Sequence, residues 1–256
     1  MDKQRRRFLK VAGFTVIGLA GAGPLRRLVG ATESAAAPSR DPRAKRWAMV
    51  VDPRRCLEKE GCTACVEVCD RAHNVPRIPN HQHEVRWIWK EPFADAFLEQ
   101  EDQLVDEALT AKPLLVFCNH CDNPPCVRVC PTQATWRRDD GIVMMDWHRC
   151  IGCRYCMAGC PYGSRSFNWE DPRPYIAETN PDFPTRCKGV VEKCTFCDER
   201  VDQGKVPACV AACPEKALTF GDLNDPNSEV RRLIRARYAL RRKPELGTRP
   251  SVFYLV

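Results

Sequence analysis

The chain has 256 residues, enough for one or two domains, and contains 17 cysteines. So many free thiols would react with one another unless metal ions or disulfides held them, so the cysteines have to be explained first. The formal charge of +7 does not indicate a nucleic-acid partner, because residues 1–31 contribute +6 of it.

The first 31 residues have the pattern of an export signal. Arg5-Arg6-Arg7-Phe8-Leu9-Lys10 precede an apolar run from Val11 to Gly23, and Val29-Gly30-Ala31 has the small-x-small form of a signal-peptidase site. The apolar run is too short to cross the hydrocarbon core of a bilayer as a helix. The basic motif resembles a twin-arginine signal, which implies export of the folded protein to the periplasm. We therefore expect a signal peptide at residues 1–31 and a flexible, proline-containing lead-in at residues 32–46.

Sixteen of the 17 cysteines form four groups. The groups are Cys56-x5-Cys62-x2-Cys65-x3-Cys69, Cys118-x2-Cys121-x4-Cys126-x3-Cys130, Cys150-x2-Cys153-x2-Cys156-x3-Cys160 and Cys194-x2-Cys197-x11-Cys209-x3-Cys213. The third group, followed by Pro161, has the spacing of bacterial ferredoxins, in which three thiolates hold one cluster and the fourth ligates its neighbour. A zinc ribbon uses two separated C-x2-C knuckles, and a disulfide framework has no reason to repeat these spacings. Because two groups make one unit with two clusters, the sequence predicts four [4Fe–4S] clusters.

Between the groups, the apolar patterns predict short elements. Strands are expected at residues 47–52, 84–89, 114–117 and 217–220, and Asp140-Gly141 predicts a hairpin over residues 135–146. Residues 93–111 have a weakly helical pattern. A basic helix is expected between Pro226 and Pro244. Its apolar face would consist of Val230, Leu233, Ile234 and Tyr238.

The four spacings together resemble the four-cluster ferredoxin-type electron-transfer subunits of membrane-associated respiratory complexes, from about Trp47 to the C-terminus. This resemblance implies an α+β, tandem bacterial-ferredoxin-like (double dicluster) fold with short strands, short helices and long loops. One ferredoxin unit would be inserted in the other. The outer unit would comprise residues 47–112 and 182–256 with cysteine groups one and four, and the inserted unit residues 113–181 with groups two and three.

The same resemblance implies how the thiols are shared among the four [4Fe–4S] clusters. The outer unit would hold one cluster through Cys56, Cys62, Cys65 and Cys213, and another through Cys69, Cys194, Cys197 and Cys209. The inserted unit would hold one through Cys118, Cys121, Cys126 and Cys160, and another through Cys130, Cys150, Cys153 and Cys156. The x5 loop after Cys56 is longer than the usual x2 loop, so Cys56 is the ligand that departs most from the family pattern.

A narrower resemblance is to the DsrO family, the periplasmic iron–sulfur subunits of DsrMKJOP complexes in sulfur metabolism. It is carried by the twin-arginine motif, the run from Cys69 to Pro76, Trp87-Ile88-Trp89 and the run from Cys160 to Trp169. It implies two partners: an integral-membrane, quinone-interacting NrfD-type (DsrP-like) subunit and a multihaem cytochrome c (DsrJ-like). The protein would be attached peripherally to the membrane through these and other subunits of the complex, without a transmembrane anchor of its own.

We therefore expect an electron relay without a substrate site. The sequence has no Ser/His/Asp arrangement, no P-loop and no glycine-rich dinucleotide motif, so no catalytic residue is predicted. Two alternatives remain open. One is the electron-transfer subunit of a periplasmic molybdopterin oxidoreductase or hydrogenase, and the other is a disulfide-stapled structural protein.

Some residues outside the cysteine groups also bear on the site. Cys187 is expected to be a buried structural thiol, with a replacement ligand or a redox-active thiol as alternatives. His120, within the second group, is expected to be a solvated loop residue, with tuning of a cluster as the alternative. His81 and His83 are expected to be exposed, and His73 to form local hydrogen bonds.

Overall fold

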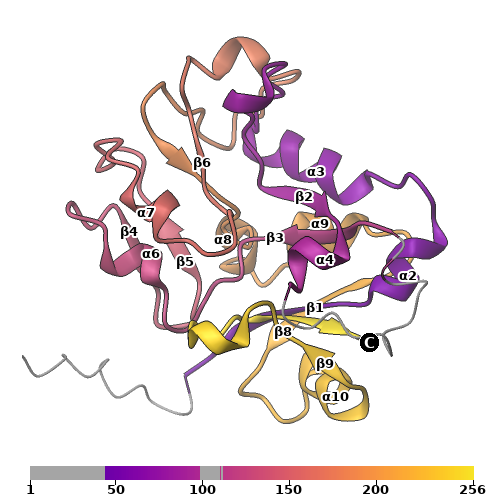
Figure 1. Ribbon diagram of the computed structural model, residues 1–256. Coiled ribbons are helices and arrows are strands. Elements are labelled where there is room, and N and C mark those ends of the chain that lie inside the picture. The colour runs from indigo at the N-terminus through magenta and orange to yellow at the C-terminus, as the bar shows by residue number, and fades with distance from the viewer. Residues whose placement is uncertain (1–43, 99–109, 111) are drawn as a thin grey trace, which may run out of the picture. The chain divides into compact units, whose positions relative to one another are not determined.

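Short strands and helices connect the cysteine groups (Figure 1). The computed structural model describes residues 44–98, 110 and 112–256, which include all seventeen cysteines. The expected α+β class with short elements and long loops is confirmed. The expected signal peptide and most of the expected lead-in lie outside the described residues. Within these ranges, no helix is both long and apolar enough to span a bilayer.

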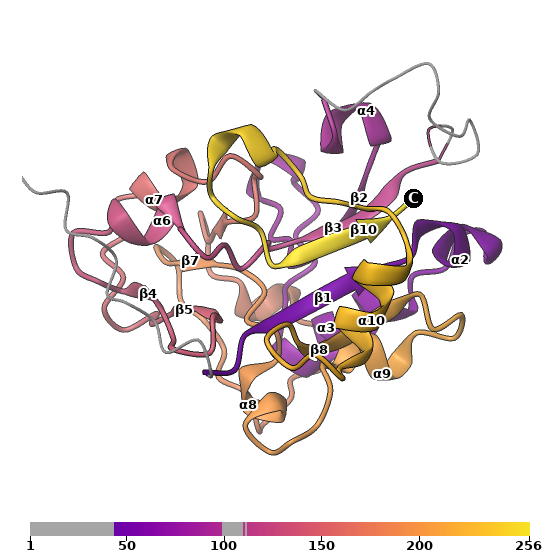
Figure 2. The same cartoon turned by 90° about the horizontal axis from the view of Figure 1, so that it is seen from below.

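The largest sheet joins the two ends of the described chain. It has the order β8-β1-β10-β9, with bounds Leu218–Asp222, Trp47–Val51, Val252–Leu255 and Ala239–Leu240. Strand β1 pairs in parallel with β10, beside which it lies in Figure 2, and antiparallel with β8. Because side chains alternate along β1, Val50 packs against Val230 of helix α10 (Glu229–Ala236), whereas Met49 and Val51 enter the main core.

Helix α10 is shorter than expected. Ser228 caps its N-terminus by accepting a hydrogen bond from the Arg231 N–H. The helix ends at Ala236, because the chain is extended from Arg237 onward and enters β9, which pairs with β10. The expectation that Tyr238 lies on the apolar face of this helix is therefore wrong, since Tyr238 follows the helix and is 73% exposed.

Three two-stranded antiparallel ladders lie between the cysteine groups. They are β2 (Ile88–Glu91) with β3 (Leu114–Phe117), β4 (Thr135–Arg137) with β5 (Val143–Met145), and β6 (Ser166–Phe167) with β7 (Val191–Glu192). The hairpin expected over residues 135–146 is confirmed, and Gly141 has a φ of +91° in its turn. The strand expected at residues 84–89 is displaced to β2, because the chain before it forms the 3₁₀ helix η2 (His81–His83).

The remaining helices are short, and most carry cysteines. They are α2 (Pro53–Glu58), α3 (Ala64–His73), α4 (Phe93–Ala96), α6 (Pro125–Arg128), α7 (Tyr155–Ala158), α8 (Asp198–Val201) and α9 (Ala208–Ala212), with the 3₁₀ helices η3 (Arg173–Tyr175) and η4 (Pro244–Leu246). Of the weakly helical pattern expected over residues 93–111, the structure describes residues 93–98 and 110. Helix α4 ends at Ala96, because the backbone of Phe97 is not helical (φ −129°, ψ 44°). Residues 99–109 and 111 lie outside the described ranges.

Two buried apolar clusters hold the cysteine-bearing segments together. The larger contains Met49, Trp87, Phe117 and Tyr254, so it combines the beginning, middle and end of the described chain. The smaller contains Cys126, Ala134, Val143, Met145, Cys156 and Val191. The division into an outer and an inserted ferredoxin unit stays a prediction.

One ion pair lies deep in the protein. The guanidinium Nη2 of Arg186 is 2.6 Å from a carboxylate oxygen of Glu192, and both side chains are at most 1% exposed. Glu192 also accepts hydrogen bonds from Trp87 Nε1 and Asn168 Nδ2, and Arg186 donates to the backbone carbonyl of Asn74. The pair therefore links segments far apart in the sequence.

Replacing Arg186 with methionine should lower the free energy of unfolding by about 3–5 kcal/mol, because Glu192 would remain buried without its counter-charge. The matched control is Arg173→Met, since the Arg173–Asp171 pair is exposed to solvent and its loss should have no measurable effect. Denaturant unfolding under anaerobic conditions measures both. Equal stabilities of the two variants would contradict this prediction.

Candidate metal centres

Eight of the predicted ligands line two cavities, with four cysteines in each. The first cavity is lined by Cys56 from α2, Cys62 from the following loop, Cys65 from α3 and Cys213, which follows α9. We call these residues the Cys56 set. Despite the longer loop after it, Cys56 lies with the three other residues that the family resemblance groups with it.

The second cavity is lined by the Cys69 set, which consists of Cys69, Cys194, Cys197 and Cys209. Helix α3 contributes Cys65 to the first cavity and Cys69 to the second, because residues four apart lie one above the other on a helix. Burial raises the pKa of Cys209, and negative charge on neighbouring thiols, including Cys65, raises it further. The two sets are therefore neighbours.

The Cys118 set consists of Cys118, Cys121, Cys126 and Cys160. Burial raises the pKa of Cys121, and negative charge on the three other thiols of the set adds to the effect, so the four sulfurs lie close together. The pKa of Cys194 is also raised, first by burial and then by charge on Cys118. The Cys118 set therefore lies beside the Cys69 set.

The remaining four predicted ligands form the Cys150 set, which consists of Cys130, Cys150, Cys153 and Cys156. Cys130, Cys150 and Cys156 pack in the smaller apolar cluster, whereas Cys153, from the same loop as Cys150, is exposed to solvent. Burial raises the pKa of Cys156, and charge on Cys126 contributes, so this set adjoins the Cys118 set. Helices α6 and α7, which carry these two cysteines, pack against each other.

The chemistry of these sets fits iron–sulfur clusters. All seventeen cysteines are described and free of disulfides. Burial, followed by the charges of neighbouring thiols, raises the pKa of Cys65 and of Cys194 to about 12, so both thiols are protonated at neutral pH without metal. Four adjacent thiolates require positive charge among them, and iron bound by these cysteines would supply it in exchange for the thiol protons.

Polar groups also point at several sulfurs. Backbone N–H groups donate from Phe196 to Cys194 Sγ (3.4 Å), from Ala208 to Cys197 Sγ (3.3 Å) and from Ala217 to Cys213 Sγ (3.3 Å). Although burial opposes it, hydrogen bonds from Thr135, Thr132 and Ala134 lower the pKa of Cys130. Hydrogen bonds to sulfur stabilise its negative charge and are one of the factors that set a cluster's reduction potential.

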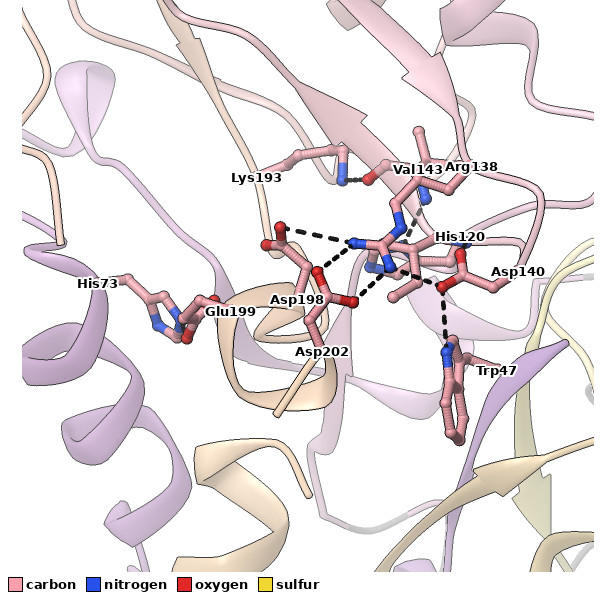
Figure 3. Close-up of polar contacts among 11 residues, drawn as sticks. Trp47, His73, His120, Arg138, Asp140, Val143, Lys193, Asp198, Glu199 and Asp202 are labelled. Carbon is pink, nitrogen blue, oxygen red and sulfur yellow. Dashed lines mark hydrogen bonds and ion pairs between the residues drawn. The ribbon is translucent and has the colours of Figure 1, made fainter. Parts of the chain in front are cut away.

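Two buried basic side chains near the sulfurs were not anticipated from the sequence. Lys193 is fully buried and donates from Nζ to the carbonyl oxygens of Val143, as drawn in Figure 3, and of Cys194. Arg165 donates to Cys126 Sγ at 3.1 Å. The signal in the sequence is weak: Lys193 directly precedes a cysteine group, and Arg165 follows one closely.

His73 forms local hydrogen bonds, as expected. Its Nδ1 lies 3.0 Å from the carbonyl oxygen and 3.6 Å from the sulfur of Cys69, and its Nε2 lies 3.1 Å from a carboxylate oxygen of Glu199, which it faces in Figure 3. His73, Glu199 and Cys197 together offer three ligand atoms within 4.8 Å of one another. Because Cys197 belongs to the Cys69 set, these residues lie at that centre rather than at a separate one.

The expectations for His120 and Cys187 are wrong. His120 is fully buried rather than solvated, because its Nδ1 accepts a hydrogen bond from the Val143 N–H (3.0 Å) and its ring stacks on Phe196 at 3.7 Å. Cys187 is exposed rather than buried, because it lies in a surface segment in which the neighbouring residues 184, 185 and 188 are also exposed and Arg186 is the buried residue. Neither feature can be inferred from sequence spacing.

An arginine joins the hairpin between groups two and three to helix α8. Arg138 lies 2.9 Å from Asp140, 2.5 Å from Asp202 and 3.9 Å from Asp198 (Figure 3). Trp47 Nε1 donates to Asp140 at 3.2 Å. These contacts hold the Cys69 set, which α8 flanks, against the hairpin that follows cysteine group two.

Comparisons with known proteins agree with this arrangement. Residues 113–175 and 180–223 match the family model described as 4Fe-4S dicluster domain. The chain is 41% identical to the Hdr-like menaquinol oxidoreductase iron-sulfur subunit 1 of Archaeoglobus fulgidus, over 98% of this chain and 97% of that protein. It is 38% identical to the menaquinone reductase iron-sulfur cluster-binding subunit of Nitratidesulfovibrio vulgaris, over 82% and 88% of the two chains. It is 36% identical to the arsenate respiratory reductase iron-sulfur subunit ArrB of a Shewanella species, over 82% and 96%.

Replacing Gly152 with alanine should destabilise the protein and lower the iron content at the Cys150 set. Gly152 has a φ of +70°, and a Cβ there would lie 2.5 Å from the carbonyl oxygen of Gly189. The matched control is Gly163→Ala, because Gly163 has a φ of +62° but no atom within 4 Å of such a Cβ. In both variants, the left-handed backbone conformation destabilises alanine relative to glycine by about 1–2 kcal/mol. Only Gly152→Ala adds a steric clash with the backbone. Iron analysis and thermal unfolding measure the difference, and equal losses in both variants would contradict the prediction.

Proposed function

Because the chain belongs to the family of iron–sulfur subunits with 4Fe-4S dicluster domains, we propose that it relays single electrons through four [4Fe–4S] clusters between partners in a membrane-associated complex. Members of this family are electron-transfer subunits rather than catalytic subunits. When bound, each cluster accepts and releases one electron. The protein holds the sulfur ligands, excludes water and sets the distances between the clusters.

The observation that carries this proposal is that the four cysteine sets form a continuous series. The Cys56 set adjoins the Cys69 set through Cys65 and Cys209, and the Cys69 set adjoins the Cys118 set through Cys194 and Cys118. The Cys118 set adjoins the Cys150 set through Cys126. We propose that all sixteen cysteines of these sets are cluster ligands, as grouped above.

We further propose that the protein works in the periplasm, after export by the twin-arginine route, in a complex of the DsrMKJOP type. It would pass electrons between a multihaem cytochrome c and an NrfD-type, quinone-interacting membrane subunit. The motif at residues 5–10 supports export, and the names of two relatives, a menaquinol oxidoreductase subunit and a menaquinone reductase subunit, support a quinone-linked partner.

A second candidate function is the electron-transfer subunit of a periplasmic molybdopterin oxidoreductase or hydrogenase. It is favoured by the similarity to the iron–sulfur subunit of an arsenate respiratory reductase, which extends over 96% of that protein. The two candidates share the relay and differ in the protein at its end.

Isolation of the native complex tests both candidates. The chain, tagged at its C-terminus and purified anaerobically from its own organism in mild detergent, should bring with it a multihaem cytochrome c and an NrfD-type membrane protein. Reduction by a quinol analogue should then bleach the iron–sulfur absorbance of the complex. Co-purification of a molybdopterin-containing protein instead would favour the second candidate. A colourless chain without inorganic sulfide would contradict the relay itself.

Replacing Cys153 with serine should remove or alter mainly the cluster proposed for the Cys150 set. The matched control is Cys187→Ser, since both thiols are exposed but Cys187 belongs to no set. Iron and sulfide analysis with EPR of the reduced protein distinguishes the variants, because the unaltered protein should hold about sixteen iron atoms in four clusters. The assignment of Cys153 as a cluster ligand would be contradicted if Cys153→Ser had the spectra of the unaltered protein, or if Cys187→Ser changed them to the same extent.

A further inference from the structure

Arg165 is a buried cation that contacts sulfur. It is 4% exposed and lies directly before β6. Its Nη2 donates to Cys126 Sγ at 3.1 Å and to Thr135 Oγ1 at 2.8 Å, and its Nη1 lies 3.7 Å from Met145 Sδ. Among the residues that the structure describes, no carboxylate forms an ion pair with it.

The other two buried arginines show what such a side chain ordinarily requires. Arg186 is paired with Glu192 at 2.6 Å, and Arg242 with Glu91 at 2.8 Å. A guanidinium removed from water without a counter-charge is costly. The negative charge that accompanies Arg165 must therefore come from the sulfur atoms around it.

Those sulfur atoms belong to two different sets. Burial lowers the pKa of Arg165, but the charges of Cys126, Cys156 and Cys118 outweigh burial and raise it. Burial raises the pKa of Cys156, and both the charge of Arg165 and a hydrogen bond from it act in the opposite direction. The packing agrees, because Cys126 and Met145, which Arg165 contacts, lie in the same apolar cluster as Cys156. Arg165 thus lies where the Cys118 set and the Cys150 set meet.

We propose that Arg165 is the shared counter-cation of the two clusters held by the Cys118 set and the Cys150 set, and that it raises the reduction potential of both. The inference rests on the proposed relay. A reduced cluster carries one more negative charge than an oxidised one, so a fixed cation beside it favours the reduced form. Because the same cation faces both clusters, it stabilises an added electron on either of them. The electron passes between clusters only, and Arg165 gains or loses neither proton nor bond.

The test is a potentiometric EPR titration of the full chain, purified anaerobically, with Arg165 replaced by methionine. At the midpoint potential of the unaltered protein, the ratio of reduced to oxidised cluster should fall about tenfold for the two clusters that Arg165 faces, which corresponds to about 59 mV for a one-electron couple. The two clusters of the Cys56 and Cys69 sets should keep their potentials. The signal of the Cys150 set is identified by its loss in Cys153→Ser.

Two further variants make the test specific. Arg165→Lys keeps the charge but cannot donate to Cys126 and Thr135 in the same geometry, so it should shift the same two clusters in the same direction by less. Arg137→Gln is the matched control, because Arg137 lies on β4 close to Thr135 but is paired with Asp122 at 3.4 Å. It should leave all four potentials unchanged.

The proposal is overturned if every Arg165 variant that assembles its clusters has the potentials of the unaltered protein, or if all four potentials shift equally. If Arg165→Lys is the only variant that assembles its clusters, the reduction potentials of that variant decide whether the proposal holds. If the unaltered protein itself lacked four reducible clusters, the proposed relay would be contradicted. That result is distinct from a failure of the Arg165 proposal, in which the four clusters are present and their potentials do not change as expected.

Discussion

The fold depends on gathering sulfur ligands in the interior around metal. Cysteines from all four groups contribute to the apolar clusters that form the core, so the metal sites and the core are built from the same residues. Without iron, burial keeps thiols such as Cys65 and Cys194 protonated, and the core contains cavities lined by sulfur. Cluster binding therefore contributes folding free energy, since the unfolded chain cannot hold the same four ligands together.

Buried positive charge is distributed in two ways. Arg186 and Arg242 are paired with Glu192 and Glu91, and these pairs connect segments far apart in the sequence. Arg165 and Lys193 instead contact a cysteine sulfur or backbone carbonyl oxygens close to the cysteine sets. The first kind is electrically balanced before metal is bound, whereas in the second kind Arg165 contacts a sulfur and Lys193 contacts only backbone carbonyl oxygens. Charge of the second kind is therefore suited to setting the properties of the clusters.

Much of the site could be predicted from sequence because cysteine spacing is a local property. The four groups, the hairpin over residues 135–146 and the short strands all follow from patterns within single short segments of the chain, the longest being the fourth group at residues 194–213. The burial of His120 could not be predicted, because it depends on a hydrogen bond from Val143 and on stacking against Phe196. The end of α10 at Ala236 likewise depends on pairing between β9 and β10. Interactions between distant segments decide these features.

The spacing within two pairs of neighbouring centres follows from the covalent structure. The last cysteine of a group lies in a different set from the group's other cysteines: Cys69 lies with Cys194, Cys213 with Cys56, and Cys160 with Cys118. Only three residues separate each of these from the preceding cysteine, and that cysteine lies in a short helix, so the two sets joined in this way lie about one helical turn apart. The longer loop after Cys56 does not disturb this relation, because Cys56 is held by α2, which Asp52 caps, rather than by the loop. The closeness of the Cys56 and Cys69 sets, and of the Cys118 and Cys150 sets, is thus fixed where the chain crosses from one set to the other. The Cys69 and Cys118 sets have no such link, and packing between distant segments brings Cys194 near Cys118.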